Sequence, residues 1–260
     1  MSQIWNFERN VYYVRRLDPT MIIFLAIMAY MTITGGRFAS PMGWLMSTLL
    51  VLPGIIVGIT FHEFAHAYSA YKLGDYTPKV QRRVSLNPFR HLDPIGLICI
   101  IFVGFGWGKP VMVNPVNFKK KGRDDIIVSL AGVVTNFILA VLLTVVATLI
   151  YRFALPFLFT ATGEWVYTSL IFAININLVL MVFNLLPVPP LDGFNVITGL
   201  LGIQYTDVYY KMYQYGMFIL MALIVFGVVR TLIGVTVNPL GTLLMNLAGL
   251  SWVLQVGFFQ

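Results

Sequence analysis

Residues 44–72 read WLMSTLLVLPGIIVGITFHEFAHAYSAYK, an apolar run that ends in two histidines, a glutamate and a lysine. About 20 apolar residues in a helix are enough to cross the hydrocarbon of a bilayer, so this run is long enough to be a membrane span. Pro53 and Gly54 are expected to kink it, because proline removes a backbone donor. The run predicts a membrane protein with ionisable side chains inside one of its spans.

The composition of the chain also indicates a membrane protein. Of its 260 residues, 58% are hydrophobic and 10% are charged, and the mean hydropathy is +0.83. A soluble domain carries about 25% charged residues. The net charge of +7 is interpreted as a topology signal, and no nucleic-acid partner is expected. The single cysteine, Cys99, excludes an internal disulfide and is expected to be a small core residue.

Six spans are expected, in an all-α membrane domain that takes up residues 1–260. They lie at about 19–34, 44–72, 126–151, 165–187, 212–229 and 237–256. The N-terminal residues carry charges of both signs and show no short apolar core before a cleavage site, so no cleavable signal peptide is expected. The sequence predicts nothing about the oligomeric state.

The connection between the second and third spans, residues 73–125, is long and mixed in character. Its apolar middle, IGLICIIFVGFGWGKP, is too short and too rich in glycine for a span, and we expect a re-entrant or interfacial segment. Before it, TPKVQRRVSLNP alternates loosely between apolar and polar residues. This alternation predicts a short β segment.

Lysine and arginine are distributed unequally between the two sides of the predicted spans. With the N-terminus inside, 14 of the 17 lie in inner segments, and the other three are Arg37, Arg152 and Arg230. Cytoplasmic segments carry such an excess. The sequence therefore predicts a multi-pass protein of the cell membrane with both termini in the cytoplasm.

The strongest chemical signal is His62-Glu63-Phe64-Ala65-His66. Residues four apart share one face of a helix, so His62 and His66 are placed to bind one zinc ion, with Glu63 placed to act on a water beside it. The alternative is a chance arrangement of core residues. An ionisable residue in the middle of a span costs at least about 2.5 kcal/mol, and that cost argues against chance.

A catalytic zinc ion usually has three protein ligands and one open position. Asp192 stands in NLLPVPPLDG, residues 184–193, at the end of the fourth span, and is predicted to lie in the same leaflet as His66. It is the candidate for the third ligand, and the alternative is an ordinary turn residue before Gly193. A second alternative is a membrane metalloprotease site in which a glutamate is the third ligand. Glu164 would then be that ligand, but it is predicted at the outer end of its span, far from His66.

The paired motifs HEFAH and NLLPVPPLDG resemble those of the site-2 proteases, which are intramembrane zinc metalloproteases. The resemblance is greatest to small prokaryotic members without PDZ or CBS domains, and it covers about residues 60–200. It implies that His62, His66 and Asp192 hold one zinc ion and that Glu63 is the catalytic base. Further stretches that carry it are LGD (73–75), NPFRHLDPIG (87–96), GFGWGKPVMVNP (104–115) and AGVVTN (131–136).

Two residues depart from the family pattern. The family commonly has proline where this chain has Val133, and often a small residue where it has Phe194. Neither is expected to be a ligand, so activity is expected to survive. The departures leave the local packing of helices open.

The predicted function is zinc-dependent endoproteolysis of transmembrane segments near the cytoplasmic leaflet, with Glu63 as general base. The predicted partners are a membrane-protein substrate with a transmembrane helix and the lipid bilayer. The alternative is a divalent-metal transporter or a metal-binding membrane protein without proteolytic activity. Transporters often contain inverted repeats, and the sequence shows no repeat.

Three features keep two interpretations each. Asn136 resembles the family asparagine that contacts the substrate or the oxyanion, and the alternative is a helix-to-helix hydrogen bond. His91 is either a group that supports or reversibly binds the zinc or a surface residue. Residues 80–115, with their glycines Gly104, Gly106 and Gly108, either pair with an extended substrate or anchor the chain at the headgroups through Trp107.

Overall fold

The computed structural model describes residues 19–251 and 253. Within this part of the chain every named element is a helix, and five helices are long and apolar enough to cross a membrane. They are α3 (Pro41–Lys72), α6 (Lys121–Phe153), α8 (Ala161–Asn184), α10 (Asp207–Val225) and α11 (Val228–Leu247). The predicted class, an all-α multi-pass membrane protein, is confirmed.

The outer faces of these helices are apolar. On α6, Leu142, Val145 and Leu149 are each half exposed or more, at 55%, 50% and 50%. A soluble monomer rarely exposes a continuous apolar surface of this kind. These side chains therefore face lipid.

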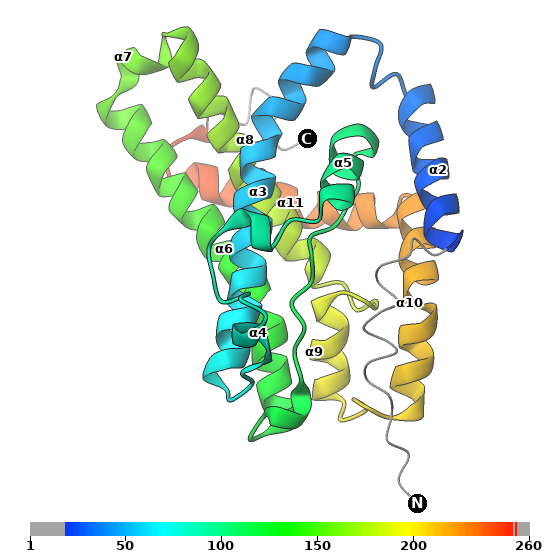
Figure 1. The fold of residues 1–260 in the computed structure, drawn as a ribbon. Coiled ribbons are helices and arrows are strands. Elements are labelled where there is room, and N and C mark those ends of the chain that lie inside the picture. The colour runs from blue at the N-terminus through cyan, green and yellow to red at the C-terminus, as the bar shows by residue number, and fades with distance from the viewer. Residues whose placement is uncertain (1–18, 252, 254–260) are drawn as a thin grey trace, which may run out of the picture.

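The centre of the fold is formed by α3, α6 and α8, which pack against one another in all three pairs and run side by side (Figure 1). Close approach depends on small residues, as is usual between membrane helices. A Cβ atom on Gly54 of α3 would lie 2.7 Å from the Cα atom of Ala173 on α8. The main core is made of buried side chains of α6, α8 and α11, among them Ile174 and Leu178, which are fully buried.

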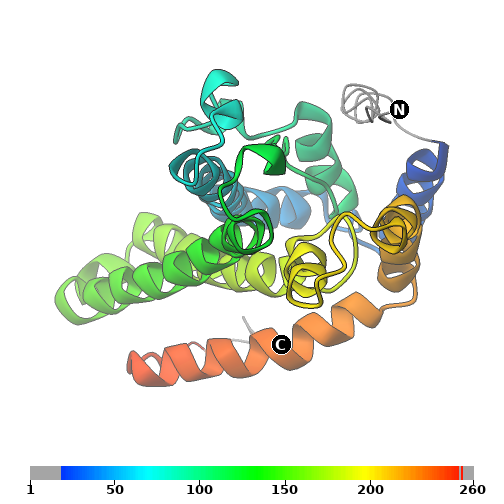
Figure 2. The same ribbon diagram turned by 90° about the horizontal axis from the view of Figure 1, so that it is seen from below.

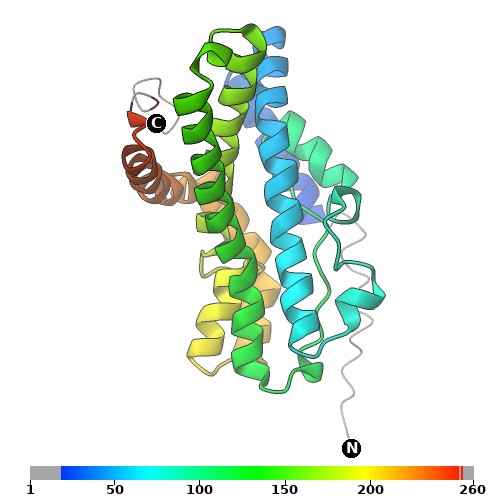
Figure 3. The same cartoon turned by 90° about the vertical axis from the view of Figure 1, so that its left-hand side faces the viewer.

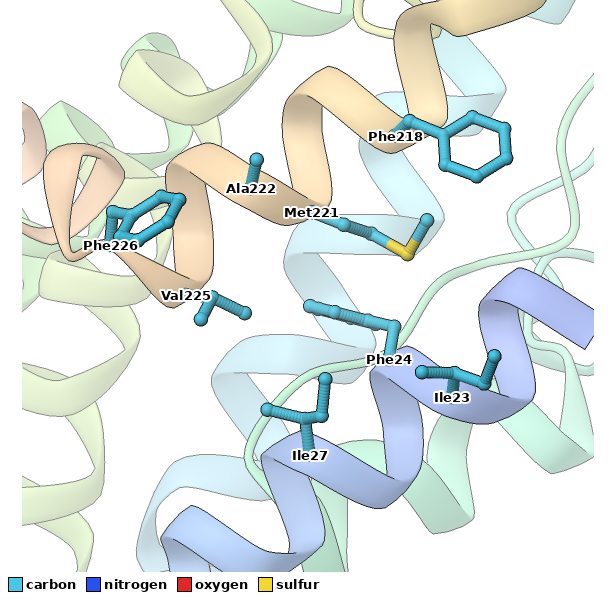
Figure 4. Close-up of a pocket in the computed structure, with 8 residues that line it drawn as sticks. All are labelled: Ile23, Phe24, Ile27, Phe218, Met221, Ala222, Val225 and Phe226. Carbon is cyan, nitrogen blue, oxygen red and sulfur yellow. The ribbon is translucent and has the colours of Figure 1, made fainter.

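The first predicted span is a helix at the predicted place, α2 (Pro19–Thr34), but it has only 16 residues. This is short of the roughly 20 residues that cross hydrocarbon, so the described part of the chain contains five long apolar helices where six spans were predicted. An apolar cavity of about 270 Å³ lies between α2 and α10 (Figure 4). It is lined by Ile23, Phe24, Ile27, Phe218, Met221, Ala222, Val225 and Phe226.

The last two predicted spans, 212–229 and 237–256, are displaced relative to α10 and α11. The break between these helices falls at Gly227, whose φ of +76° favours glycine, and not in the predicted loop around Arg230. Helix α11 runs across the central helices instead of along them (Figure 2). The predicted placement of both termini concerns residues outside the described part of the chain and stays a prediction.

The predicted short β segment is wrong for the described residues. Between α3 and α6 the chain forms α4 (Thr77–Val80), the 3₁₀ helix η2 (Pro88–Arg90), α5 (Pro94–Val103) and the 3₁₀ helix η3 (Pro115–Asn117). The β pairing there is reduced to an isolated bridge between Leu92 and Gly108. The physical reason is proline, which cannot donate to a ladder and which is the first residue of η2, α5 and η3.

The apolar middle of this connection forms α5 and then reverses direction as a chain without helix or strand, and both parts lie on one side of α3 (Figure 3). Helix α5 begins after Asp93, whose side chain accepts hydrogen bonds of 2.9 Å from two backbone N–H groups, and ends at Gly104, with a φ of +82°. A Cβ atom on Gly106 would collide with the carbonyl of Gly96. The returning chain therefore lies directly against α5.

The end of α5 is tied to other helices. The carbonyl of Val103 accepts a hydrogen bond of 3.0 Å from the hydroxyl of Thr32 on α2. The carbonyl of Ile101 accepts one of 3.3 Å from the indole of Trp44 on α3 and one of 3.4 Å from Arg37. Two of the carbonyls that the helix leaves unpaired at its C-terminus are thereby satisfied.

Asp75 ties the end of α3 to the chain just before α6. It is fully buried, and its carboxylate accepts hydrogen bonds from Thr77, from the backbone N–H of Asn114 and from the side chain of Asn117. Burial raises the pKa of this carboxyl, but the hydrogen bonds together outweigh burial and lower it. The ionised carboxylate of Asp75 therefore holds the connection in place through its hydrogen bonds.

Candidate metal centre

Two histidines of α3 and one aspartate of α9 (Asp192–Leu200) bring three ligand atoms together. The Nε2 atoms of His62 and His66 are 2.9 Å apart. The Oδ2 atom of Asp192 lies 3.2 Å from the Nε2 atom of His62 and 3.3 Å from that of His66. The side chains that the sequence proposed as ligands thus converge from two helices that are far apart along the chain.

This triangle fits a zinc ion. Zinc binds histidine nitrogen and carboxylate oxygen at about 2.0–2.1 Å, and a tetrahedral angle separates two such ligand atoms by about 3.3 Å. The Oδ2 atom of Asp192 is buried and accepts no hydrogen bond from the described residues. A buried carboxylate oxygen without a partner is costly, and a cation between the three side chains would satisfy it.

The outer nitrogen of each histidine is held by α6. The Nδ1 atom of His62 lies 2.6 Å from the Oδ1 atom of Asn136, and the Nδ1 atom of His66 lies 2.8 Å from the carbonyl oxygen of Val128. With both acceptors in place, each Nδ1 carries the proton and donates it. Both Nε2 atoms are then free to bind a metal, which is the usual arrangement of histidine ligands.

Gly132 lets the two imidazoles lie directly against α6. A Cβ atom at this position would be 2.5 Å from the Cε1 atom of His62 and 2.6 Å from the Nε2 atom of His66. Gly132 and Asn136 are four residues apart and share one face of α6. Gly132 belongs to the quoted stretch AGVVTN (131–136), but the sequence assigned it no role, because its contact with the imidazoles depends on how α6 packs against α3.

Asn136 is fully buried and fully engaged with the protein. Its Nδ2 atom donates to the carbonyl of Gly58 at 3.2 Å and to the Oδ1 atom of Asn177 at 2.9 Å. These bonds join α6 to α3 and α8, and they are of the helix-to-helix kind that the sequence left as the alternative. A contact of Asn136 with the substrate stays a prediction.

The carboxylate of Glu63 contacts the connection between α3 and α6. Its Oε2 atom accepts a hydrogen bond of 2.9 Å from the backbone N–H of Val111. The guanidinium of Arg83 approaches the same oxygen, with its Nη2 atom 3.8 Å away. The extended chain that follows α5 therefore lies directly beside the predicted catalytic base.

His91 is not a surface residue, because it is fully buried. Its Nε2 atom donates to the carbonyl of Ser85 at 2.6 Å, and its own carbonyl accepts a hydrogen bond of 2.7 Å from the N–H of Lys109. Both partners belong to the connection between α3 and α6. A role of His91 toward the metal stays a prediction.

Of the remaining residues singled out in the sequence, two are buried in the helix packing and one lies far from the site. Val133 and Phe194 are buried, at 4% and 2% exposure, and the ring of Phe194 stacks on Tyr209 with the ring centres 5.2 Å apart. Glu164 lies in the first turn of α8, at the end of that helix away from the chain leading to Asp192. At about 1.5 Å per residue, most of the length of α8 separates Glu164 from that end.

The comparison with known proteins decides the family. The sequence model of "Peptidase family M50" matches residues 50–227, a range that includes the three predicted ligands and the predicted catalytic base. The chain belongs to peptidase family M50. The resemblance to the site-2 proteases is thereby confirmed, and with it the enzyme class, an intramembrane zinc metalloprotease with a His-His-Asp candidate metal site.

Two curated relatives in this family show how far the similarity extends. The chain is 47% identical over 147 residues to "Putative zinc metalloprotease YwhC" of Bacillus subtilis (strain 168), over 56% of this chain and 66% of that relative. It is 29% identical over 215 residues to "Putative zinc metalloprotease Rip2" of Mycolicibacterium smegmatis, over 78% of this chain and 79% of that relative. The match with YwhC thus spans just under two thirds of its length. No solved structure gives a significant match to this chain.

Proposed function

We propose that this M50 protease is an endopeptidase that cleaves transmembrane segments of membrane-protein substrates near the cytoplasmic leaflet, with Glu63 as general base. The observation that supports this most directly is the triangle of His62, His66 and Asp192, with Glu63 on the same helix beside it. Membership of a peptidase family favours proteolysis over metal transport.

The chemistry follows from the positions of the residues. Zinc bound by the three ligands would polarise a peptide carbonyl and acidify a water. Glu63 accepts one proton from the attacking water, whose oxygen adds to the carbonyl carbon. The carbon–nitrogen bond then breaks, and Glu63 delivers the proton to the leaving amine. The Oε1 atom of Glu63 is available for this proton, since the hydrogen bond from Val111 is made to Oε2.

Substrate access is proposed to occur along the connection. The path of α5 and the returning chain fits a re-entrant segment, because irregular backbone at membrane depth has to be buried in protein or line a wet cavity. Residues 109–114 are extended beside Glu63 and would offer main-chain groups to an unwound substrate by strand addition. An interfacial anchor through Trp107 is the competing role.

The test is cleavage of a single-span reporter by purified protein in liposomes. Wild-type protein is expected to cleave it, to stop when a chelator removes the metal, and to recover when zinc is returned. Glu63→Gln is expected to retain zinc and to lose at least about 100-fold in rate, the usual contribution of a general base. Normal cleavage by Glu63→Gln would refute the mechanism, and sequencing of the products shows whether the cut lies near the cytoplasmic leaflet.

A further inference from the structure

Arg83 is a buried cation beside Glu63 that the proposed reaction does not use. It is 4% exposed, although it lies in the irregular chain between α4 and η2. Its Nε and Nη1 atoms are buried and find no hydrogen-bond partner among the described residues. A buried charge is costly unless it is paired, and the anion beside Arg83 is Glu63.

Two groups of the connection reach the same oxygen of Glu63. The backbone N–H of Val111 lies 2.9 Å from Oε2, and the Nη2 atom of Arg83 lies 3.8 Å from it. The same Nη2 atom also donates a hydrogen bond to the carbonyl of Lys109. Lys109 is two residues before Val111, so Arg83 holds both the carboxylate and the piece of chain that carries its hydrogen-bond donor.

The close approach of this chain to Glu63 is built into the sequence at Gly108. A Cβ atom there would lie 2.7 Å from the Cγ2 atom of Ile59 on α3 and 3.9 Å from the Oε1 atom of Glu63. Any larger residue would push the chain away from α3. Both recorded contacts of the carboxylate are made to Oε2, and none of the described residues donates a hydrogen bond to Oε1.

We propose that Arg83 is a positioning residue for the catalytic base. Together with the N–H of Val111 it holds Oε2 of Glu63 in place, so that Oε1 is turned to the attacking water. The inference rests on the proposed function, because it assigns a partner to the base of that reaction. The carbonyl of Lys109 needs only a hydrogen-bond donor, whereas Glu63 is an anion, so the charge of Arg83 acts on Glu63.

The experiment compares three variants in the reporter assay, with kcat, KM and zinc content measured for each. Arg83→Gln keeps a hydrogen-bond donor and removes the charge. It is expected to lower kcat by about 10- to 100-fold, because a small displacement of a catalytic group has effects of that size. KM and the zinc content are expected to stay at the wild-type values. Arg83→Lys restores a cation and is expected to recover most of kcat.

The neighbouring residue supplies the matched control. Arg82 is exposed, so Arg82→Gln removes the same charge from the same loop without emptying the position beside Glu63. It is expected to leave kcat unchanged. A general electrostatic effect of the loop would lower kcat in both variants and would overturn the proposal.

A second measurement reads the contact without turnover. Hydrogen exchange followed by mass spectrometry reports the protection of the Val111 amide through peptides that cover residues 109–113. Arg83→Gln is expected to speed exchange in these peptides and Arg82→Gln is not. Unchanged exchange together with unchanged kcat would overturn the inference.

The remaining outcomes also decide between roles. If Arg83→Gln loses zinc or if Arg83→Lys recovers nothing, Arg83 is a structural residue and the positioning role is refuted. If wild-type protein binds zinc and cleaves no reporter, the proposed function itself fails. Arg83 would then be assigned to the stability of the connection, which the exchange measurement shows separately.

Discussion

The Oδ1 atom of Asn136 on α6 accepts a hydrogen bond of 2.6 Å from the Nδ1 atom of His62 on α3, although the two residues are 74 positions apart in the chain. The same amide donates to α3 and α8, so one buried side chain joins the three central helices and also holds one candidate zinc ligand. A polar group with no water around it needs all of its partners. The orientation of the metal site and the packing of the central helices therefore depend on the same residue.

Replacing Asn136 by leucine is expected to weaken zinc binding by about 10- to 100-fold, the usual effect of losing the partner of a histidine ligand. Zinc affinity is measured by competition with a chelator of known affinity. Asn136→Asp keeps an acceptor for His62 and is the control, with a smaller loss expected. Wild-type affinity in Asn136→Leu would contradict the orienting role.

Gly132→Ala is expected to disrupt the metal site without changing a ligand, because the added Cβ atom would lie 2.5–2.7 Å from atoms of both imidazoles. Overpacking of this kind costs about 1–3 kcal/mol of stability, and zinc content is expected to fall. Both are measured on protein in detergent, by thermal unfolding and by metal analysis. Gly234→Ala in α11 is the control, since a Cβ atom there meets nothing within 4 Å.

Asp192→Asn is expected to lose most of the bound zinc, because the substitution replaces a buried charged oxygen ligand by a neutral one. Glu164→Gln is expected to keep full zinc content, since it lies at the far end of α8 from the chain that leads to Asp192. Metal analysis of the two proteins after dialysis against the same zinc buffer tests both statements. The reverse result would revive the glutamate-ligand type of site.

The stability contributed by His91 is expected to depend on pH. Burial and the nearby charge of Arg83 lower the pKa of His91 below its ordinary value of 6.5, against the opposing effect of its hydrogen bond to Ser85. Because the folded protein holds His91 neutral, its contribution is complete above pH 6.5 and is lost as the pH falls below that value.

His91→Gln provides the measurement for this prediction. The difference in unfolding free energy between wild type and His91→Gln is expected to be about 1–3 kcal/mol at pH 8, the cost of a disturbed buried hydrogen bond, and to shrink toward pH 5. All other residues are the same in the two proteins, so any pH dependence that they cause cancels in the difference. A difference that stays constant over this range would mean that His91 does not titrate.

Much of the site was predictable because its motifs are local. His62 and His66 are four residues apart, and helix geometry alone puts their side chains on one face. The prediction of Asp192 as a third ligand also required the count of spans, which placed this residue in the same leaflet as His66. Val111, Arg83 and Gly132 were not predictable in their roles, because their contacts with Glu63 and the histidines depend on how the connection and α6 pack.

The last two helices show where hydropathy is insufficient. Residues 212–256 are apolar and carry few charges, so a window as long as one span fits at several positions within them. The ends of the two helices therefore depend on single glycines. Gly227 ends α10 and starts α11, whereas Gly234 lies within α11 without a turn. The backbone angle that distinguishes these two glycines is set by packing and is not encoded in hydropathy.

The sequence by itself determined that the chain is a helical membrane protein, that its chemistry centres on His62, Glu63 and His66, and which aspartate could join them. These follow from periodicity, apolar length and charge, which are properties of short segments. Only the tertiary structure decided that Asp192 lies within 3.3 Å of both histidines, that Asn136 and Val128 of α6 pair with their outer nitrogens, and that Val111 and Arg83 of the connection lie against Glu63. Such contacts join residues tens of positions apart, and they exist only once the close packing of small residues has brought the backbones together.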